Sequence, residues 1–407
     1  MKTISPISII VGLAVVVLVV IAISFEDGGT ASRQTAKIGA LMPTTGGLQV
    51  YGESSINGVH LAVDEVNAAG GVLGGALELV FGDTQTAPQA GVDAAQRLVS
   101  TERVAGLIGA LGSGVTIPVA TSVSAVQKIP QISNASTSPV ITDLADNDFL
   151  FRTVPHDALQ GIILANVMMQ QGIDKVSIIY INNDYGQGLA EALEKSYGGE
   201  ITDMIAYEEK QASYRAELQK AKDGGADTLV LIGYPGDGIP ILRQSLEDGA
   251  FDKFVFTDGM KANEVGEAIG APLDGAFGTA PSADSESAAA QTFRKMYETK
   301  YGELPPQPFI DAAYDAGIVM ALAIHKAGST DGTAVRDALR QVAGPPGTEF
   351  GPGQFAEAKA ALDRGEDINY QGAAGTQDFD ANGDVPGTYS HWAFKGGKVE
   401  EVELIQP

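Results

Sequence analysis

From Lys37 onward, short apolar runs alternate with longer amphipathic stretches, and this alternation restricts the possible folds more than any other property of the chain. The runs KIGALMP, LELVFGD and VAGLIGALG are typical of buried strands, and INGVHLAVDEVNAAGG and PQAGVDAAQRLVSTE between them are typical of helices. Glycine ends the first helix and proline lies in the first turn of the second. Strands that alternate with helices form a parallel sheet covered on both faces. The sequence therefore predicts an α/β protein.

The same pattern restarts after about 150 residues, which indicates a second unit of similar design. Its helices and strands run from QGIILANVMMQQG and KVSIIYIN to KFVFTD. A chain of 407 residues is also too long for one hydrophobic core. Helices are predicted over 289–302 and 309–328, followed by a glycine- and proline-rich section over 344–353. The end is predicted to form antiparallel hairpins, with turns at the NG of 382–383 and the GG of 396–397.

The N-terminus differs from the rest of the chain. Lys2 precedes an almost unbroken apolar run, Ile7–Phe25, and small residues follow it. This order is typical of an export signal, with a cleavage site among the small residues. The run also approaches the roughly 20 residues that span a bilayer, so an uncleaved anchor is the alternative. Either interpretation predicts a periplasmic or extracytoplasmic location.

Composition excludes several kinds of chemistry. The chain has no cysteine, so thiol catalysis, disulfides and cysteine metal sites are excluded. Its four histidines are scattered and form no H-x-x-x-H pair, which argues against a histidine metal site. The net charge of −25 would repel a phosphate backbone and so argues against nucleic-acid binding.

The stretch GALGSGVT, residues 109–116, departs at one position from the phosphate-binding pattern G-x-x-x-x-G-K-[ST]. Val115 stands where that pattern has lysine, which disfavours a nucleotide. A tight strand-to-helix turn without a ligand is one alternative. The other is a carboxylate held by Ser113 and backbone amides at a helix start, because a single negative charge needs no lysine.

A second loop, ISNASTSP over residues 132–139, follows the next predicted strand and is dense in hydroxyl groups. Ligands of parallel sheets bind at the carboxyl ends of the strands. Ser113, Ala135 and Thr137 are therefore expected to converge. Hydroxyl-rich turns also occur as ordinary helix caps, so each loop alone is a weak signal.

Three residues of the second unit follow its predicted strands in the same way. Tyr185, Tyr234 and Asp258 combine two aromatic rings with one carboxylate, a set that suits an ammonium group. Ordinary core packing is the alternative for each tyrosine taken singly. A molecule with both a carboxylate and an ammonium group is an amino acid.

Several phrases in this order resemble the periplasmic binding proteins of branched-chain amino-acid transporters. They are IGALMPTTGGLQVYGESSINGVHLAVDEVNAAGG, LIGALGSGVTIP, PQISNASTSP, FRTVP, NNDYGQGLAEAL and INYQGAAGTQDFDANGDV. The resemblance covers roughly residues 37–400. It implies the type I fold of solute-binding proteins of amino-acid and amide ABC transporters. That fold has two Rossmann-like lobes with parallel sheets flanked by helices, a three-crossover hinge, and a ligand in the cleft between the lobes.

The resemblance also implies a division of the chain and a set of ligand-binding residues. After the signal or anchor at 1–36, lobe 1 is expected to comprise 37–153 plus 281–386, and lobe 2 to comprise 154–280 plus 387–407. The carboxylate is assigned to Ser113 and Thr137 with backbone near Gly112 and Ala135, and the ammonium group to Tyr185 and Asp258. Tyr234, Tyr51 and Phe309 are expected to line the cleft.

The expected function is capture of leucine, isoleucine or valine and delivery to a membrane permease with its ATPases. An amide, urea or aromatic carboxylate is the alternative ligand, and a membrane-anchored sensing receptor is the alternative role. No nucleophile elbow, histidine cluster or complete nucleotide loop is present, so we expect no enzyme activity, cofactor or metal. The segment DFDANGD, Asp378–Asp384, opens like a calcium loop, but Tyr389 stands where the twelfth-position glutamate belongs.

Overall fold

The computed structural model of the protein describes residues 35–406. The apolar run Ile7–Phe25 lies outside the described residues, as does all of the predicted signal or anchor segment except its last two residues. Among the helices of residues 35–406, none is both long and apolar enough to cross a membrane.

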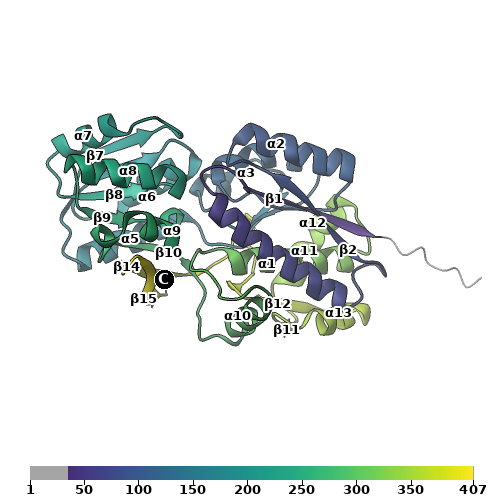
Figure 1. The fold of residues 1–407 in the computed structure, drawn as a ribbon. Coiled ribbons are helices and arrows are strands. Elements are labelled where there is room, and N and C mark those ends of the chain that lie inside the picture. The colour runs from purple at the N-terminus through teal and green to yellow at the C-terminus, as the bar shows by residue number, and fades with distance from the viewer. Residues whose placement is uncertain (1–34, 407) are drawn as a thin grey trace, which may run out of the picture. The chain divides into compact units, whose positions relative to one another are not determined.

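Five parallel strands form the first sheet, in the order β2-β1-β3-β4-β5, of which β1 and β2 are labelled in Figure 1. The strands are β1 (Ala36–Met42), β2 (Leu77–Asp83), β3 (Leu107–Gly109), β4 (Gln131–Ser133) and β5 (Leu150–Arg152). Because β3 and β4 are parallel neighbours, the two loops that follow them leave the same edge of the sheet side by side.

Alternate residues of the central strands point to opposite faces of this sheet. Leu41 and Leu107 belong to a core cluster with Leu98 and Val119, under the helices α2 (Pro88–Arg97) and α3 (Ser113–Val119). The other face is covered by α1 (Gln49–Ala68) and α11 (Ile310–Ala327), which pack against each other. The predicted parallel sheet with helices on both faces is confirmed.

Seven strands form the second sheet, in the order β15-β14-β10-β9-β8-β6-β7. Its strands are β6 (Lys175–Ile181), β7 (Glu200–Tyr207), β8 (Thr228–Ile232), β9 (Lys253–Phe256), β10 (Phe277–Ser282), β14 (Thr388–Lys395) and β15 (Lys398–Ile405). Its helices are α5 (Asp157–Gln170), α6 (Asp184–Ser196), α7 (Arg215–Asp223), α8 (Pro235–Asp248) and α9 (Asn263–Ile269). The strands β6 to β10 are parallel, whereas β14 and β15 join one edge in antiparallel fashion.

One of the two predicted C-terminal hairpins exists. Gly396 and Gly397 connect β14 to β15, as expected. The hairpin predicted at 382–383 is wrong, because no strand flanks that turn. Asp380 bends the chain instead: its Oδ1 accepts from the amides of Asn382 (2.7 Å) and Asp384 (3.0 Å), which is an aspartate-centred turn.

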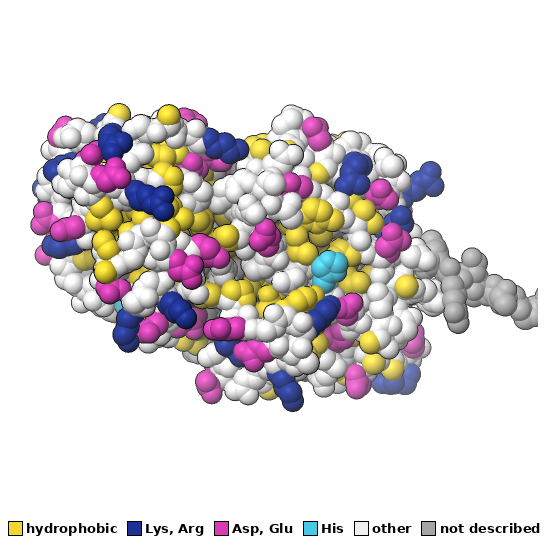
Figure 2. Space-filling model, viewed as in Figure 1, with side chains coloured by type: hydrophobic (Ala, Val, Ile, Leu, Met, Phe, Trp, Pro, Cys, Tyr) yellow, Lys and Arg dark blue, Asp and Glu magenta, His cyan; other side chains and the backbone are white. Residues whose placement is uncertain are grey.

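Besides α11, six helices and strands lie between β10 and β14 in sequence. They are α10 (Ala288–Tyr301), α12 (Gly332–Ala343), β11 (Thr348–Phe350), α13 (Phe355–Asp363), β12 (Ile368–Gly372) and β13 (Gly375–Thr376). They pack against the first sheet through α11 and α1. The chain thus passes between the two sheets three times: after β5, after β10 and before β14. On the face in Figure 2, acidic and basic side chains are interspersed.

Candidate functional site

A small cavity lies where loops of the two sheets meet. Its volume is about 20 Å³, enough for roughly one water molecule. The residues that line it are Leu48, Tyr51, Leu111, Gly112, Ser113, Ala135, Tyr185, Tyr234, Asp258, Gly259 and Phe309. The structure therefore brings eight of the nine predicted ligand residues to one place. Thr137 is the ninth, and it does not line the cavity.

The first sheet contributes the loops after β3 and β4. Gly112 precedes α3, and Ser113 is the first residue of that helix. The Ser138 amide donates to Ser113 Oγ at 3.2 Å, so the two loops are joined. The hydroxyls of Ser133 and Ser136 also donate to backbone carbonyls of the first loop, Ala110 O (2.7 Å) and Leu111 O (2.9 Å). The hydroxyls of this region therefore fix the loops as well as offering polar groups.

Thr137 lies next to the start of α5. Its carbonyl accepts from the Asp157 amide at 2.8 Å. Its hydroxyl is buried and finds no hydrogen-bond partner within the described part of the chain. A buried polar atom without a hydrogen-bond partner costs free energy. A movement of this loop, or a polar group bound beside the hydroxyl, would lower that cost.

The second sheet contributes the three residues that were predicted to meet an ammonium group. Asn183 caps α6 by accepting from the amides of Tyr185 (3.1 Å) and Gly186 (3.0 Å), which places Tyr185 in the first helical turn. The rings of Tyr185 and Tyr234 stack at 5.4 Å with an interplanar angle of 13°. The Tyr185 hydroxyl donates to Asp258 Oδ1 at 2.8 Å.

Asp258 is a buried carboxyl group at the carboxyl end of β9. Burial raises its pKa to about 6, although hydrogen bonds from Tyr185 and Gln160 act in the opposite direction. The Gln160 Nε2 donor lies 3.0 Å from Asp258 Oδ1. A cation in the cavity would offset this desolvation and stabilise the ionised carboxylate.

Sequence reasoning missed two residues of α5, Asp157 and Gln160. The predicted helix began at Gln160, whereas α5 begins at Asp157. Asp157 is fully buried, and neither of its carboxyl oxygens has a hydrogen-bond partner among residues 35–406. Burial, and then the charge of Asp258, raises the pKa of Asp157 well above its usual range, although the nearby Thr137 hydroxyl and the charge of Arg152 act in the opposite direction. An aspartate directly after a proline-containing turn was the available signal, but it is equally typical of an ordinary helix start.

Direct contacts join the two sides of the cavity, one formed by the first sheet with its helices and loops and the other by the second sheet with its own. The Tyr51 hydroxyl on α1 donates to the Asp258 carbonyl at 2.8 Å, and the Gly236 amide donates to the Gly47 carbonyl at 3.4 Å. These contacts, with a volume of only about 20 Å³, describe a closed arrangement. A molecule larger than water does not fit in the cavity in this arrangement.

Phe309 lines both this small cavity and a larger one. It precedes α11 with a φ of 82°, in the left-handed region that a bulky residue rarely adopts. Asn134 Nδ2 donates to its carbonyl at 3.2 Å. The larger cavity, about 350 Å³, is lined by the passages between the sheets and by the loop that precedes Phe309.

No group of three or more histidines, aspartates and glutamates within residues 35–406 is arranged to hold a metal ion. In the aspartate-rich segment 378–384, Asp380 and Asp384 already accept hydrogen bonds from the protein itself. The D-x-D-x-N-G pattern is therefore explained by a turn.

Known proteins share this architecture. The sequence profile of the family described as Periplasmic binding protein matches residues 35–365. A chemotactic signal transduction system substrate-binding protein, BasB of Halobacterium salinarum, is 26% identical over 390 residues, covering 92% of this chain and 90% of that protein. Leucine binding protein LivK of Thermotoga maritima is 25% identical with a TM-score of 0.78, over 92% of this chain and 99% of LivK. LivJ of Streptococcus pneumoniae, a branched-chain amino acid transporter substrate binding protein solved with isoleucine, is 26% identical with a TM-score of 0.76, over 92% of this chain and all of LivJ (100%).

Proposed function

Because the chain belongs to the periplasmic binding protein family, we propose that it captures a branched-chain amino acid between its two sheets and delivers it to an ABC transporter. One observation carries the choice of ligand. Hydroxyl and backbone groups around Ser113 and Ala135 face the same cavity as the buried carboxyl group of Asp258. A zwitterion with one carboxylate and one ammonium group matches both sets of groups, because its carboxylate suits the hydroxyl and backbone groups and its ammonium group suits Asp258.

The carboxylate end is assigned to the loops after β3 and β4. Ser113 contributes its hydroxyl, and Gly112 and Ala135 contribute backbone groups. Thr137 belongs to the same loop as Ala135, and its hydroxyl, which has no hydrogen-bond partner within residues 35–406, is available if the loop shifts as the two sides separate. Hydroxyl and amide donors suit a single negative charge, whereas a phosphate would call for lysine or arginine.

The ammonium end is assigned to Asp258, with Asp157 beside it. Asp258 already accepts from Tyr185 and Gln160, so its position is defined before a ligand arrives. The stacked rings of Tyr185 and Tyr234 add cation–π attraction. Two buried carboxyl groups without a neighbouring ammonium group are unfavourable, and a bound ammonium group would relieve that repulsion.

The remaining wall suits a branched aliphatic side chain. Leu48, Leu111, Ala135 and Phe309 line the same cavity and offer apolar surface. Micromolar binding corresponds to about −8 kcal/mol, a size that two desolvated polar ends and one buried aliphatic side chain can supply.

The first test is calorimetry of residues 36–407 with leucine, isoleucine and valine. Leucinamide and 4-methylpentanoate serve as probes that lack the carboxylate and the ammonium group, respectively. Urea and benzoate test the alternative ligand classes. We expect binding of the three amino acids and weak or no binding of the four probes. Binding of benzoate or urea alone would overturn the choice of ligand and leave the family unchanged.

Asp258→Asn tests the ammonium end. We expect the affinity for leucine to fall at least about a hundredfold, because the ammonium group would lose its buried partner. Asp252→Asn, at an exposed aspartate of the same unit, is the control and is expected to leave affinity unchanged. Equal leucine affinity in Asp258→Asn and the parent protein would remove Asp258 from the site.

A sensing role is the second candidate, because BasB belongs by name to a chemotactic signal transduction system. Transport and sensing use the same capture step and differ in the membrane partner. Deletion of the gene in the source organism separates them. Loss of amino-acid uptake supports transport, whereas normal uptake with lost chemotaxis supports sensing. Both roles imply an extracytoplasmic protein, and in transport the ATP would be hydrolysed by the partner subunits.

A further inference from the structure

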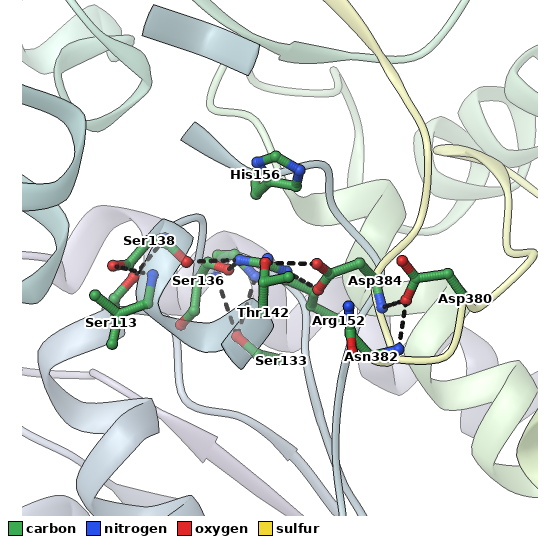
Figure 3. A network of polar contacts seen from close by, with 12 residues as sticks. Ser113, Ser133, Ser136, Ser138, Thr142, Arg152, His156, Asp380, Asn382 and Asp384 are labelled. Carbon is green, nitrogen blue, oxygen red and sulfur yellow. Dashed lines mark hydrogen bonds and ion pairs between the residues drawn. The ribbon is translucent and has the colours of Figure 1, made fainter. Parts of the chain in front are cut away.

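A fully buried arginine lies directly behind the hydroxyl-rich loop (Figure 3). Arg152 is the last residue of β5, and its side chain has no exposed surface. Its Nη1 donates to the carbonyls of Ser138 (2.9 Å) and Ser136 (3.4 Å), and its Nη2 donates to Thr142 Oγ1 (2.7 Å). The guanidinium group therefore holds the backbone on both sides of Thr137.

The partner of this arginine comes from the far end of the chain. Arg152 Nε donates to Asp384 Oδ1 at 2.6 Å, across 232 residues of sequence. Asp384 lies on the third passage between the sheets, shortly before β14, and its other oxygen accepts from Thr142 Oγ1 at 2.7 Å. Burial raises the pKa of Asp384, but the hydrogen bond and charge of Arg152 outweigh burial and hold that pKa below its usual value. The pair is therefore ionised.

Because of the geometry of the peptide bond, the hydrogen bonds from Arg152 also affect how the peptide groups of the loop after β4 are oriented. In a trans peptide the carbonyl and the following N–H point in opposite directions. A Ser136 carbonyl that points to Arg152 therefore directs the Thr137 amide away from Arg152. The Ser138 amide, on the same loop, donates to Ser113 Oγ, a lining residue of the small cavity. In Figure 3 the loop serines lie between Ser113 and Arg152.

We infer that Arg152, held by Asp384, is a positioning residue that sets the peptide orientations of residues 133–138 for binding of a ligand carboxylate. This inference rests on the proposed function. Arg152 does not line the cavity, so it acts through the loop and not on the ligand. Asp384 belongs to a passage between the sheets, and that passage must bend if the two sides of the cavity separate. The Arg152–Asp384 pair therefore also connects residues 133–138 to a segment that bends.

The test compares Asp384→Asn with a matched control, Glu401→Gln. Each change removes the negative partner of a buried cation, and each ion pair joins residues that are distant in sequence. In the control pair, the Lys261 side chain is only 4% exposed and its Nζ lies 2.9 Å from Glu401 Oε1. Glu401 has no hydrogen bond to the loops after β3 and β4. We expect Asp384→Asn to weaken leucine binding at least tenfold at a temperature where it is fully folded, and Glu401→Gln to change it less than twofold.

Amide hydrogen exchange of the ligand-free proteins provides the second readout, which does not depend on the ligand. We expect Asp384→Asn to accelerate exchange over residues 133–138, and Glu401→Gln to leave that segment unchanged. A lower melting temperature for Asp384→Asn with parental affinity and parental loop exchange would reduce the pair to a structural role. Faster exchange with parental affinity would also overturn the inference, since a looser loop would then have no effect on leucine binding.

A double variant guards against simple loss of folding. In Arg152→Met/Asp384→Leu, apolar side chains replace the whole buried pair, a change that tends to restore stability lost by removing one partner. We expect its melting temperature to recover relative to Arg152→Met, whereas leucine affinity stays at least tenfold below the parent protein. Recovery of affinity together with stability would contradict the inference. If the parent protein binds none of the amino acids, the proposed function fails, and loop exchange alone decides whether Arg152 anchors residues 133–138.

Discussion

At the scale of single residues, two buried carboxyl groups interact: Asp258 lines the cavity, and Asp157, which does not line it, is affected by the charge of Asp258. Burial raises the pKa of Asp258 to about 6, and burial together with the charge of Asp258 raises the pKa of Asp157 well above its usual range. A carboxyl group with a higher pKa in the folded than in the unfolded protein destabilises the fold once it must ionise. This unfavourable contribution is absent below about pH 4 and grows as the pH rises from about 4 to the folded-state pKa, which is about 6 for Asp258, and above that pKa it stays constant.

Asp157→Asn is therefore expected to act in opposite directions on stability and on binding. The ligand-free protein should gain about 1–3 kcal/mol in the free energy of unfolding at about pH 8, and less at about pH 4. Leucine affinity should fall, because the ammonium group would lose one of its two carboxyl neighbours. Thermal unfolding with and without leucine at both pH values measures both effects.

The exposed Asp252 again provides the control, and Asp252→Asn is expected to alter neither quantity. A variant Asp157→Asn that is less stable than the parent protein at about pH 8 would show that the carboxylate is satisfied in the fold, and would contradict the account given for the cavity.

At the scale of elements, the packing of α1 against α11 depends on glycine. A Cβ built on Gly58 of α1 would lie 2.3 Å from the Ile310 carbonyl at the start of α11, and one on Gly317 of α11 would lie 2.7 Å from the Ala62 Cβ of α1. Two small residues thus let the helix backbones approach. Because α11 begins directly after Phe309, the approach of these helices also places that cavity residue.

Gly58→Ala tests this approach. Alanine favours the helix by up to about 1 kcal/mol, but overpacking against a backbone carbonyl costs about 1–3 kcal/mol. We expect a net loss of about 1–2 kcal/mol in unfolding by urea. His60→Ala, at an exposed position of the same helix, should change stability by less than about 0.5 kcal/mol. A Gly58→Ala variant more stable than the parent would show that α11 can retreat freely.

At the scale of the whole molecule, the proposed capture of an amino acid requires the two sides of the cavity to separate and close again. The closed arrangement brings Gly114 on α3 near Asn183 at the start of α6, and a Cβ built on Gly114 would lie 3.3 Å from the Asn183 Cβ. Cβ atoms of a disulfide are about 3.5–4.5 Å apart. Since the chain has no cysteine, an engineered pair at these positions would have no competing thiol.

Gly114→Cys/Asn183→Cys, oxidised in the presence of leucine, is therefore expected to retain it. Release should be at least about tenfold slower than from the reduced form, because the cross-link prevents opening. Protein oxidised without leucine should fail to take it up. Asn183→Cys alone removes the α6 cap and controls for its loss, which costs about 1 kcal/mol. Equal release rates in oxidised and reduced protein would show that ligands leave without separation of the two sides.

The site residues that the sequence predicted are those that a local pattern positions. The site residues that it missed owe their role to a residue far away in the sequence. Ser113, Tyr185, Tyr234 and Asp258 each follow a predicted strand, and strand ends of a parallel sheet share an edge by geometry. Asp157 and Gln160 were missed because a helix start with aspartate has an ordinary local explanation, and only the position of Asp258 gives it another.

Local patterns by themselves determined the alternation of strands and helices, the two sheets and the C-terminal hairpin at Gly396, because each depends on the order of apolar and turn-forming residues. The family followed from the resemblance of several longer phrases to known binding proteins. Tertiary structure alone decided the rest. It joined Arg152 to Asp384 across the chain, turned residues 380–384 into an anchor in place of a hairpin, and closed the cavity to about 20 Å³. Those outcomes depend on which distant groups meet in a low-dielectric interior, where a buried charge must find its partner, and no local pattern encodes that meeting.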